Sequence, residues 1–109
     1  ASEVEDVVVR DRRHLSCEGI VVPIVVVDRQ TGHLESPPEI VTRGIVDEGE
    51  AAELAEEAGR LLSGAMDARP AEERLDASLT RERVRETLRR FYKRRTQRRP
   101  MVIPVVMEV

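Results

Sequence analysis

Aromatic residues are almost absent from this chain. It contains no Trp, and Phe91 and Tyr92 are its only aromatic side chains, so any core must consist of Val, Ile, Leu and Ala. Apolar residues make up 40% of the sequence and charged residues 36%, a balance typical of a folded soluble domain rather than a disordered chain. A length of 109 residues allows one domain with a modest core.

Cysteine and long hydrophobic runs are also scarce. Cys17 is the only cysteine, which excludes an internal disulfide and fits a reducing, cytoplasmic location. The longest apolar run covers residues 20–27, which is too short to span a bilayer, and no signal-peptide pattern precedes it. We therefore expect no membrane partner. The chain does not begin with Met, and we expect it to be a piece of a longer protein.

The common catalytic patterns are missing as well. The chain has no paired histidines, no Gly-rich phosphate loop and no Gly-x-Ser-x-Gly turn. His14 and Cys17 are three residues apart, but a structural zinc ion needs four ligands and only His33 remains as a further histidine. The same His14 is too close in sequence to Ser16 and Cys17 to be assigned as their base. We expect no catalytic residue, metal or cofactor within these 109 residues.

The last twelve residues, 98–109, organise the chain. Two arginines and Pro100 end a basic segment, and a nearly continuous apolar segment then runs to Val109. Chain ends are usually polar and frayed, so this composition predicts a strand that is buried in a sheet. Residues 20–27 predict a second strand, apolar on both faces, in which the nitrogen of Pro23 must face an edge or a bulge.

A third strand is predicted over residues 39–46, where mixed polar and apolar positions are typical of an outer strand and Gly44 suggests a bulge. Between the strands predicted over residues 20–27 and 39–46, residues 28–33 predict a turn with Gly32 at positive φ. The pattern of Asp47 followed by Glu50 is a capping box that begins a helix, which we expect to end near residues 64–66.

A second helix is predicted to begin at Ser78 as its cap and to end before Pro100. Both helices have apolar residues at helical spacing, which predicts one buried stripe on each. The predicted stripes contain Leu54, Ala58, Leu61 and Leu62 in the first helix and Leu79, Val84, Leu88, Phe91 and Tyr92 in the second.

These elements predict an α/β (α+β) fold in the order strand, strand, helix, helix, strand. The expected architecture is a small three-stranded mixed sheet with two helices packed on one face. We expect the first strand to lie in the centre and the last strand to run parallel to it. The domain would cover residues 19–109, and residues 1–18 would form a linker from an upstream region, with one short strand at residues 7–9 at most.

Two helices can cover only one face of such a sheet, although the first and last strands are apolar on both faces. An uncovered apolar face of this kind indicates an interface, either with a second copy in a homo-oligomer or with another domain of the same protein. The candidate interface residues are Val22, Ile24, Val26, Ile103, Val105 and Met107, or else their alternate neighbours along the two strands.

Charge is strongly segregated along the chain. Residues 81–99 contain ten Lys or Arg and two acids, whereas the first eighty residues contain eight Arg and eighteen acids. One interpretation is that the basic helix contacts RNA phosphates. The other is that its cations pair with acidic residues of the first helix, such as Glu53 and Glu57. Tyr92 could stack on a base, but its place in the apolar stripe favours the core. The candidate RNA contacts are Arg85, Arg89, Arg90, Lys93, Arg94, Arg98 and Arg99.

Four separated blocks of the sequence resemble the C-terminal region of bacterial ribonuclease J. They are Val7–Leu15, Glu18–Val22, Pro38–Gly44 and Arg98–Val109, and they occur in the same order as in that family. The sequence departs from the family pattern at Cys17, where a polar or acidic residue is usual, and at Pro37, which interrupts the spacer.

This resemblance implies a parent enzyme of the metallo-β-lactamase fold, β-CASP group, with 5′-to-3′ exonuclease and endonuclease activity in RNA processing and decay. It implies two zinc ions on a His-x-His-x-Asp-His motif in the catalytic part of the parent. No residue of this chain matches that motif, so no catalytic or metal residue is transferred. The family's C-terminal domain is a small α/β unit, non-catalytic, that supports assembly and activity, and RNA would be reached through the parent enzyme.

Overall fold

The computed structural model describes residues 18–109. The predicted linker and the possible strand at residues 7–9 lie outside the described residues and stay predictions, as does the domain boundary near residue 18. The described elements follow the order β1 (Ile20–Val27), β2 (Glu39–Arg43), α2 (Glu48–Asp67), α3 (Ala71–Arg74), α4 (Ala77–Thr96), β3 (Met101–Val102) and β4 (Val105–Glu108).

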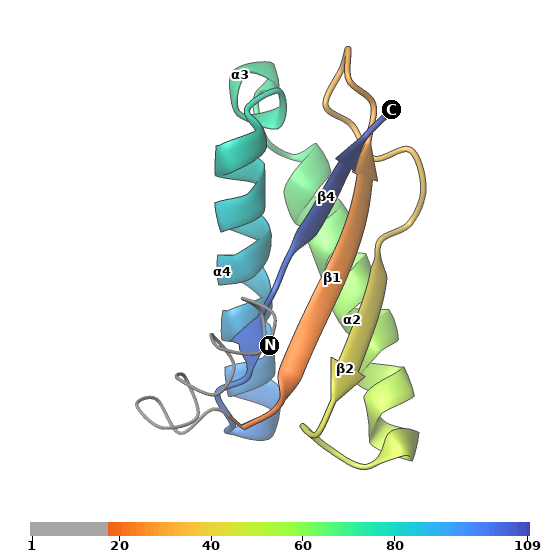
Figure 1. Ribbon diagram of the computed structural model, residues 1–109, viewed down its shortest axis with the longest axis vertical. Coiled ribbons are helices and arrows are strands. Elements are labelled where there is room, and N and C mark those ends of the chain that lie inside the picture. Colours follow the sequence, from red (N-terminus) through yellow and green to blue (C-terminus); the bar gives the residue numbers. More distant parts are fainter. Residues whose placement is uncertain (1–17) are drawn as a thin grey trace, which may run out of the picture.

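The molecule has two layers, with α2 and α4 on one side of the sheet (Figure 1). This arrangement confirms the predicted α+β class and the order strand, strand, helix, helix, strand. Two details were not predicted: the one-turn helix α3 between the long helices, and the division of the C-terminal strand into β3 and β4.

β1 is the central strand of the sheet. It pairs antiparallel with β2 on one side and parallel with β3 and β4 on the other, as the sequence predicts. Val21 pairs with Val102, and Ile24 pairs with Val105, so β3 and β4 keep one continuous register along β1. Parallel strands need a crossover connection, and here the segment from α2 to α4 provides it. This crossover packs both long helices on the same face of the sheet.

The predicted position of Pro23 at an edge or a bulge is wrong. The carbonyls of Gly19, Val21 and Val27 accept bonds from β3, β4 and their flanking residues, so odd-numbered residues of β1 direct their backbone groups toward the C-terminal strand. Pro23 shares this parity and lies in the central strand. Its missing N–H faces the interruption between β3 and β4, so the lost bond divides the neighbouring strand instead of marking an edge.

The core lies between the sheet and the two long helices. Val21 and Val25 of β1 are fully buried against Leu62 of α2 and Leu88 of α4. Full burial of such side chains stabilises the fold by roughly 1.5–3 kcal/mol each. Tyr92 is also buried, which confirms its assignment to the core, and its ring meets that of Phe91 edge-to-face with centroids 5.1 Å apart.

The predicted helix starts are right for α2 and wrong for α4. The Asp47 carboxylate accepts a hydrogen bond from the Glu50 N–H at 3.0 Å and caps α2, as predicted. α4 is capped by Asp76, which accepts from the Leu79 N–H at 3.0 Å, rather than by Ser78. α3 ends just before Asp76, so the chain enters α4 two residues earlier than the sequence pattern suggests.

The stripe predictions fail at two leucines. Thr80, Val84 and Leu88 form the buried line of α4 at four-residue spacing, which turns Leu79 about 100° away from it. Leu79 is 50% exposed, and Leu61 of α2 is 44% exposed beside the buried Leu62.

The predicted strand at residues 39–46 is shorter than expected. β2 ends at Arg43, and Gly44 follows with φ of 74°. This left-handed conformation turns the chain so that Ile45 enters the core, so Gly44 ends the strand rather than forming a bulge.

Candidate functional site

One face of the sheet carries alternate residues of β1. Val21, Val25 and Val27 point into the core, so Ile20, Val22, Ile24 and Val26 point to the opposite side, where all four are half-buried. A row of four branched aliphatic side chains along the central strand is the middle of this face.

The C-terminal strand continues the apolar row on the same side. Ile20 pairs with Met101, Ile24 with Val105 and Val26 with Met107, and directly paired residues share a sheet face. Val105 is 38% exposed and Met107 is 46% exposed, which is high for apolar residues within a sheet. All six predicted interface residues, Val22, Ile24, Val26, Ile103, Val105 and Met107, therefore lie together on one face.

β2 adds a third, partly charged row. Arg43 lies opposite Ile20, Val41 opposite Val22 and Glu39 opposite Ile24, so these three residues of β2 share the face. Sequence reasoning missed this row, although the alternation of residues 39–43 contains the signal. We use the term open sheet face for the set Ile20, Val22, Ile24, Val26, Glu39, Val41, Arg43, Met101, Ile103, Val105 and Met107.

Within residues 18–109, no helix or strand covers the open sheet face. In Figure 1, α2 lies behind the sheet and α4 lies beside β4, and both helices contribute their buried side chains to the core. The face thus presents two adjacent apolar rows, on β1 and on the C-terminal strand, bordered on β2 by one acid and one base.

The predicted RNA contacts fall into two groups. Arg85 pairs with Glu82 in its own helix. Arg89 and Arg90 both reach Glu86, at 4.0 and 3.2 Å between nitrogen and oxygen. These three cations of α4 have local acidic partners, which reduces the charge that they offer to a phosphate.

The other four candidates surround the end of α4. Lys93, Arg94, Arg98 and Arg99 are exposed, and none of them forms an ion pair within the described part of the chain. We call these four residues the free basic cluster. Among residues 18–109, one ion pair joins α4 to α2, between Arg95 and Glu57, so the interpretation in which the cations pair with the first helix holds for that contact. Arg95 also lies over the Phe91 ring, 5.7 Å from its centroid.

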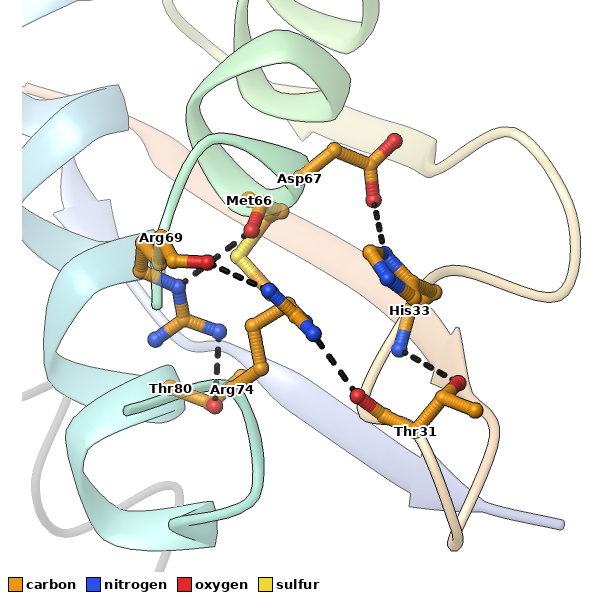
Figure 2. Close-up of polar contacts among 7 residues, drawn as sticks. All are labelled: Thr31, His33, Met66, Asp67, Arg69, Arg74 and Thr80. Carbon is orange, nitrogen blue, oxygen red and sulfur yellow. Dashed lines mark hydrogen bonds and ion pairs between the residues drawn. The ribbon is translucent and has the colours of Figure 1, made fainter. Parts of the chain in front are cut away.

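Sequence reasoning missed a buried arginine between the two long helices. Arg69 is only 7% exposed, its Nη2 donates to Thr80 Oγ1 at 3.0 Å, and its Nε donates to the Met66 carbonyl at 3.4 Å (Figure 2). Its Nη1 is buried and has no hydrogen-bond partner among residues 18–109, and burial lowers the pKa of the guanidinium. A small pocket of about 130 Å³ lies beside it, lined by Arg69, Glu73, Leu79, Glu82, Arg83 and Glu86.

The same end of the molecule holds the β1–β2 loop against the helices. Arg74 donates from Nε to the Thr31 carbonyl at 3.2 Å and from Nη1 to the Arg69 carbonyl at 2.5 Å. His33 Nδ1 lies 3.2 Å from Asp67 Oδ1 (Figure 2). These contacts fix the loop in place.

Among residues 18–109, no group of three or more His, Cys, Asp or Glu side chains is arranged to hold a metal ion. None of the described helices is both long enough and apolar enough to cross a membrane.

The architecture defines the chain as a small two-layer α+β domain with one apolar sheet face open. Its sequence matches the family described as the ribonuclease J C-terminal domain over residues 7–109. It is 36% identical to ribonuclease J2 of Bacillus subtilis (strain 168) and 32% identical to ribonuclease J 2 of Staphylococcus aureus (strain NCTC 8325 / PS 47), each over 107 residues. The alignments cover 98% of this chain and 19% of each relative.

The chain therefore belongs to the ribonuclease J C-terminal domain family, as the sequence blocks indicate. It spans about a fifth of the length of these relatives.

Proposed function

We propose that this chain is the non-catalytic C-terminal domain of a ribonuclease J-like protein and that it supports assembly through the open sheet face. The observation that carries the proposal is the exposure of adjacent apolar rows, with Val105 and Met107 at 38% and 46%, on a side of the sheet that no described element covers. Removing such rows from water is the main driving force for association between folded domains.

The parent protein would be a cytoplasmic 5′-to-3′ exo- and endoribonuclease that acts in RNA processing and decay. In this proposal the zinc ions and the catalytic residues belong to the parent's other domains, which are of the metallo-β-lactamase and β-CASP type. The family membership of this chain supports the proposal. The open sheet face would then join two copies or dock on the parent's catalytic domains.

Sedimentation velocity of the chain over a range of concentrations tests the assembly role. Val105→Lys and Met107→Lys place charges on the open sheet face at positions that are already exposed, so the fold should tolerate them. Leu61→Lys is the matched control, because Leu61 is 44% exposed on α2. We expect the unsubstituted 109-residue chain and the control variant to associate. We expect both face variants to lose this association. A strict monomer at high micromolar concentration, or association that the face variants leave unchanged, contradicts the proposal.

The free basic cluster favours a second candidate function, which is RNA binding. Lys93, Arg94, Arg98 and Arg99 are exposed cations without acidic partners in the described residues. If the cluster contacts about four phosphates of single-stranded RNA, the logarithm of the binding constant should fall with the logarithm of salt concentration at a slope of about −3.

Charge reversal separates this function from a merely solvated surface. Arg94→Glu and Arg98→Glu should each weaken RNA binding and make its salt slope shallower, while Arg90→Glu, whose native side chain is engaged by Glu86, should have a smaller effect. Fluorescence anisotropy at two salt concentrations measures both quantities. Undetectable binding at low salt, or equal effects of all three variants, contradicts an RNA site at this cluster.

A further inference from the structure

The charged row of the open sheet face is self-complementary. Glu39 and Arg43 lie two residues on either side of Val41, and both are exposed. Neither side chain forms an ion pair with another residue of the described chain; Arg43 Nη1 donates only to the Thr42 carbonyl, at 2.7 Å. An acid and a base placed symmetrically about one residue are the arrangement that a two-fold axis converts into two ion pairs.

We propose that the open sheet face binds a second copy of this chain, face to face, about a two-fold axis that crosses the strands at Val41. In this dimer Arg43 of each copy lies opposite Glu39 of the other. The inference rests on the proposed assembly function and adds the identity of the partner, the direction of the axis and the register.

When the stacked strands run along one another, a two-fold axis can lie either across the strands or parallel to them. An axis across the strands places β2 on β2, β1 on β1 and the C-terminal strand on its own copy, each pair running in opposite directions. Apolar rows then meet apolar rows: Val22 lies opposite Val22, and Ile103 lies opposite Ile103. The charged row meets the charged row, with unlike charges opposed.

An axis parallel to the strands gives a different result. It places β2 over the partner's C-terminal strand, so Glu39 and Arg43 would lie against apolar residues such as Met101 and Val105. Burying charges against apolar side chains without a partner is strongly unfavourable. The charge pattern therefore selects the axis that crosses the strands.

The twist of real sheets is compatible with this register. Stacked sheets cross at about 30°, and a residue two positions from the axis lies roughly 7 Å along its strand. The lateral offset between opposed residues is then about 3–4 Å. The long side chain of Arg43 can span this offset to reach Glu39 of the other copy. The nearer apolar residues, Val22 and Val41, remain directly stacked.

A charge-exchange experiment on the 109-residue chain tests the register. Arg43→Glu places a second carboxylate opposite Glu39 in each half of the dimer, and Glu39→Arg places a second cation opposite Arg43. We expect each single variant to weaken dimerisation at least about 10-fold, as like charges brought together at an interface do. An equimolar mixture of the two variants restores both attractive pairs, and we expect it to dimerise within about threefold of the original chain.

The double variant Glu39→Arg/Arg43→Glu should recover dimerisation in the same way. Glu53→Arg and Arg81→Glu, on exposed helix positions, are matched controls for net charge and should leave the dimer unchanged. Sedimentation equilibrium gives the dissociation constants, and circular dichroism confirms that each variant is folded.

Two other outcomes overturn the inference and are distinguishable from each other. If Met107→Lys abolishes the dimer but the single charge variants behave like their controls, or if mixing them restores nothing, the register is wrong while the assembly function stands. If the original chain does not associate at all, the assembly function fails and the register fails with it.

Discussion

Pro23 and Pro104 lie opposite each other in neighbouring parallel strands. The register that pairs β1 with β3 continues unchanged into the pairing of β1 with β4, which places the two prolines side by side. Their nitrogens point in different directions, however. The nitrogen of Pro23 faces the Ile103 carbonyl, where a ladder hydrogen bond is lost, and that of Pro104 faces the outer edge of the sheet.

This difference predicts opposite behaviour of two matched variants. In Pro23→Val the new N–H can donate to the Ile103 carbonyl and join β3 to β4, so its hydrogen exchange should be slowed at least about 100-fold relative to an unstructured amide. In Pro104→Val the new N–H points to the edge and should exchange rapidly. Exchange measured by NMR on both variants checks the prediction. Rapid exchange at residue 23 would mean that the strands are separated by something other than the missing donor.

The two prolines also show how far sequence reasoning reaches. The similar patterns Val21-Val22-Pro23 and Val102-Ile103-Pro104 predict neighbouring strands, and the structure pairs them in that register. Alternation in an apolar strand places Val22, Ile24 and Val26 on one face with no further information. Local periodicity thus indicates which residues share a face, because burial on a sheet repeats every second residue. Whether that face or the opposite one is open is decided by the packing of the helices on Val21, Val25 and Val27.

Features that depend on two distant segments could not be predicted in this way. The burial of Arg69 depends on Thr80, eleven residues away. The charged row of β2 joins the open sheet face only through its register with β1. In each case the deciding contact lies outside the local pattern from which a sequence is interpreted.

Gly32 is expected to tolerate no side chain. Its φ is 76°, and an added Cβ would lie 2.6 Å from both the Cβ and the carbonyl oxygen of Arg74. The left-handed backbone and the steric overlap together predict that Gly32→Ala lowers the free energy of unfolding by about 2–4 kcal/mol. Urea unfolding followed by circular dichroism measures the change.

Gly64→Ala is the matched control for this substitution. An added Cβ at Gly64 meets no atom within 4 Å, and the residue lies within α2. Alanine favours the helix over glycine, so the control should raise the free energy of unfolding by about 0.5–1 kcal/mol. A loss of stability of similar size in both variants would show that the tight packing of Gly32 on Arg74 is not the cause.

Arg69 and Thr80 should be energetically coupled. The two side chains are buried, and Thr80 Oγ1 is the only side-chain acceptor for the Arg69 guanidinium in the described part of the chain. Arg69→Met leaves the hydroxyl without its donor, and Thr80→Val leaves Nη2 without its acceptor, so each should lower the free energy of unfolding by about 1–3 kcal/mol.

The double variant Arg69→Met/Thr80→Val removes both polar partners. Its destabilisation should fall short of the sum of the single effects by about 1–2 kcal/mol, because neither group remains buried alone. Denaturant unfolding of the four proteins completes the cycle. Effects that add within about 0.3 kcal/mol would show that the hydrogen bond contributes little.

Tyr92 gives the fold a specific sensitivity to alkaline pH. Burial raises its pKa to about 12, and its hydroxyl is buried with no hydrogen-bond partner among the described residues. In the unfolded chain the phenol titrates near pH 10. Between about pH 10 and 12 the unfolded state has therefore lost a proton that the folded state still holds, so the free energy of unfolding falls as pH rises. The total loss across this window is about 2–3 kcal/mol.

Tyr92→Phe isolates this contribution, since it keeps the aromatic ring that meets Phe91. At pH 7 the variant should be as stable as the original chain or more stable by up to about 1 kcal/mol, because an unpartnered hydroxyl leaves the core. Its stability should exceed that of the original chain by a growing margin above pH 10. Urea unfolding at pH 7, 9, 10 and 11 measures both curves, and parallel curves throughout would show that the phenol ionises in the folded state as easily as in water.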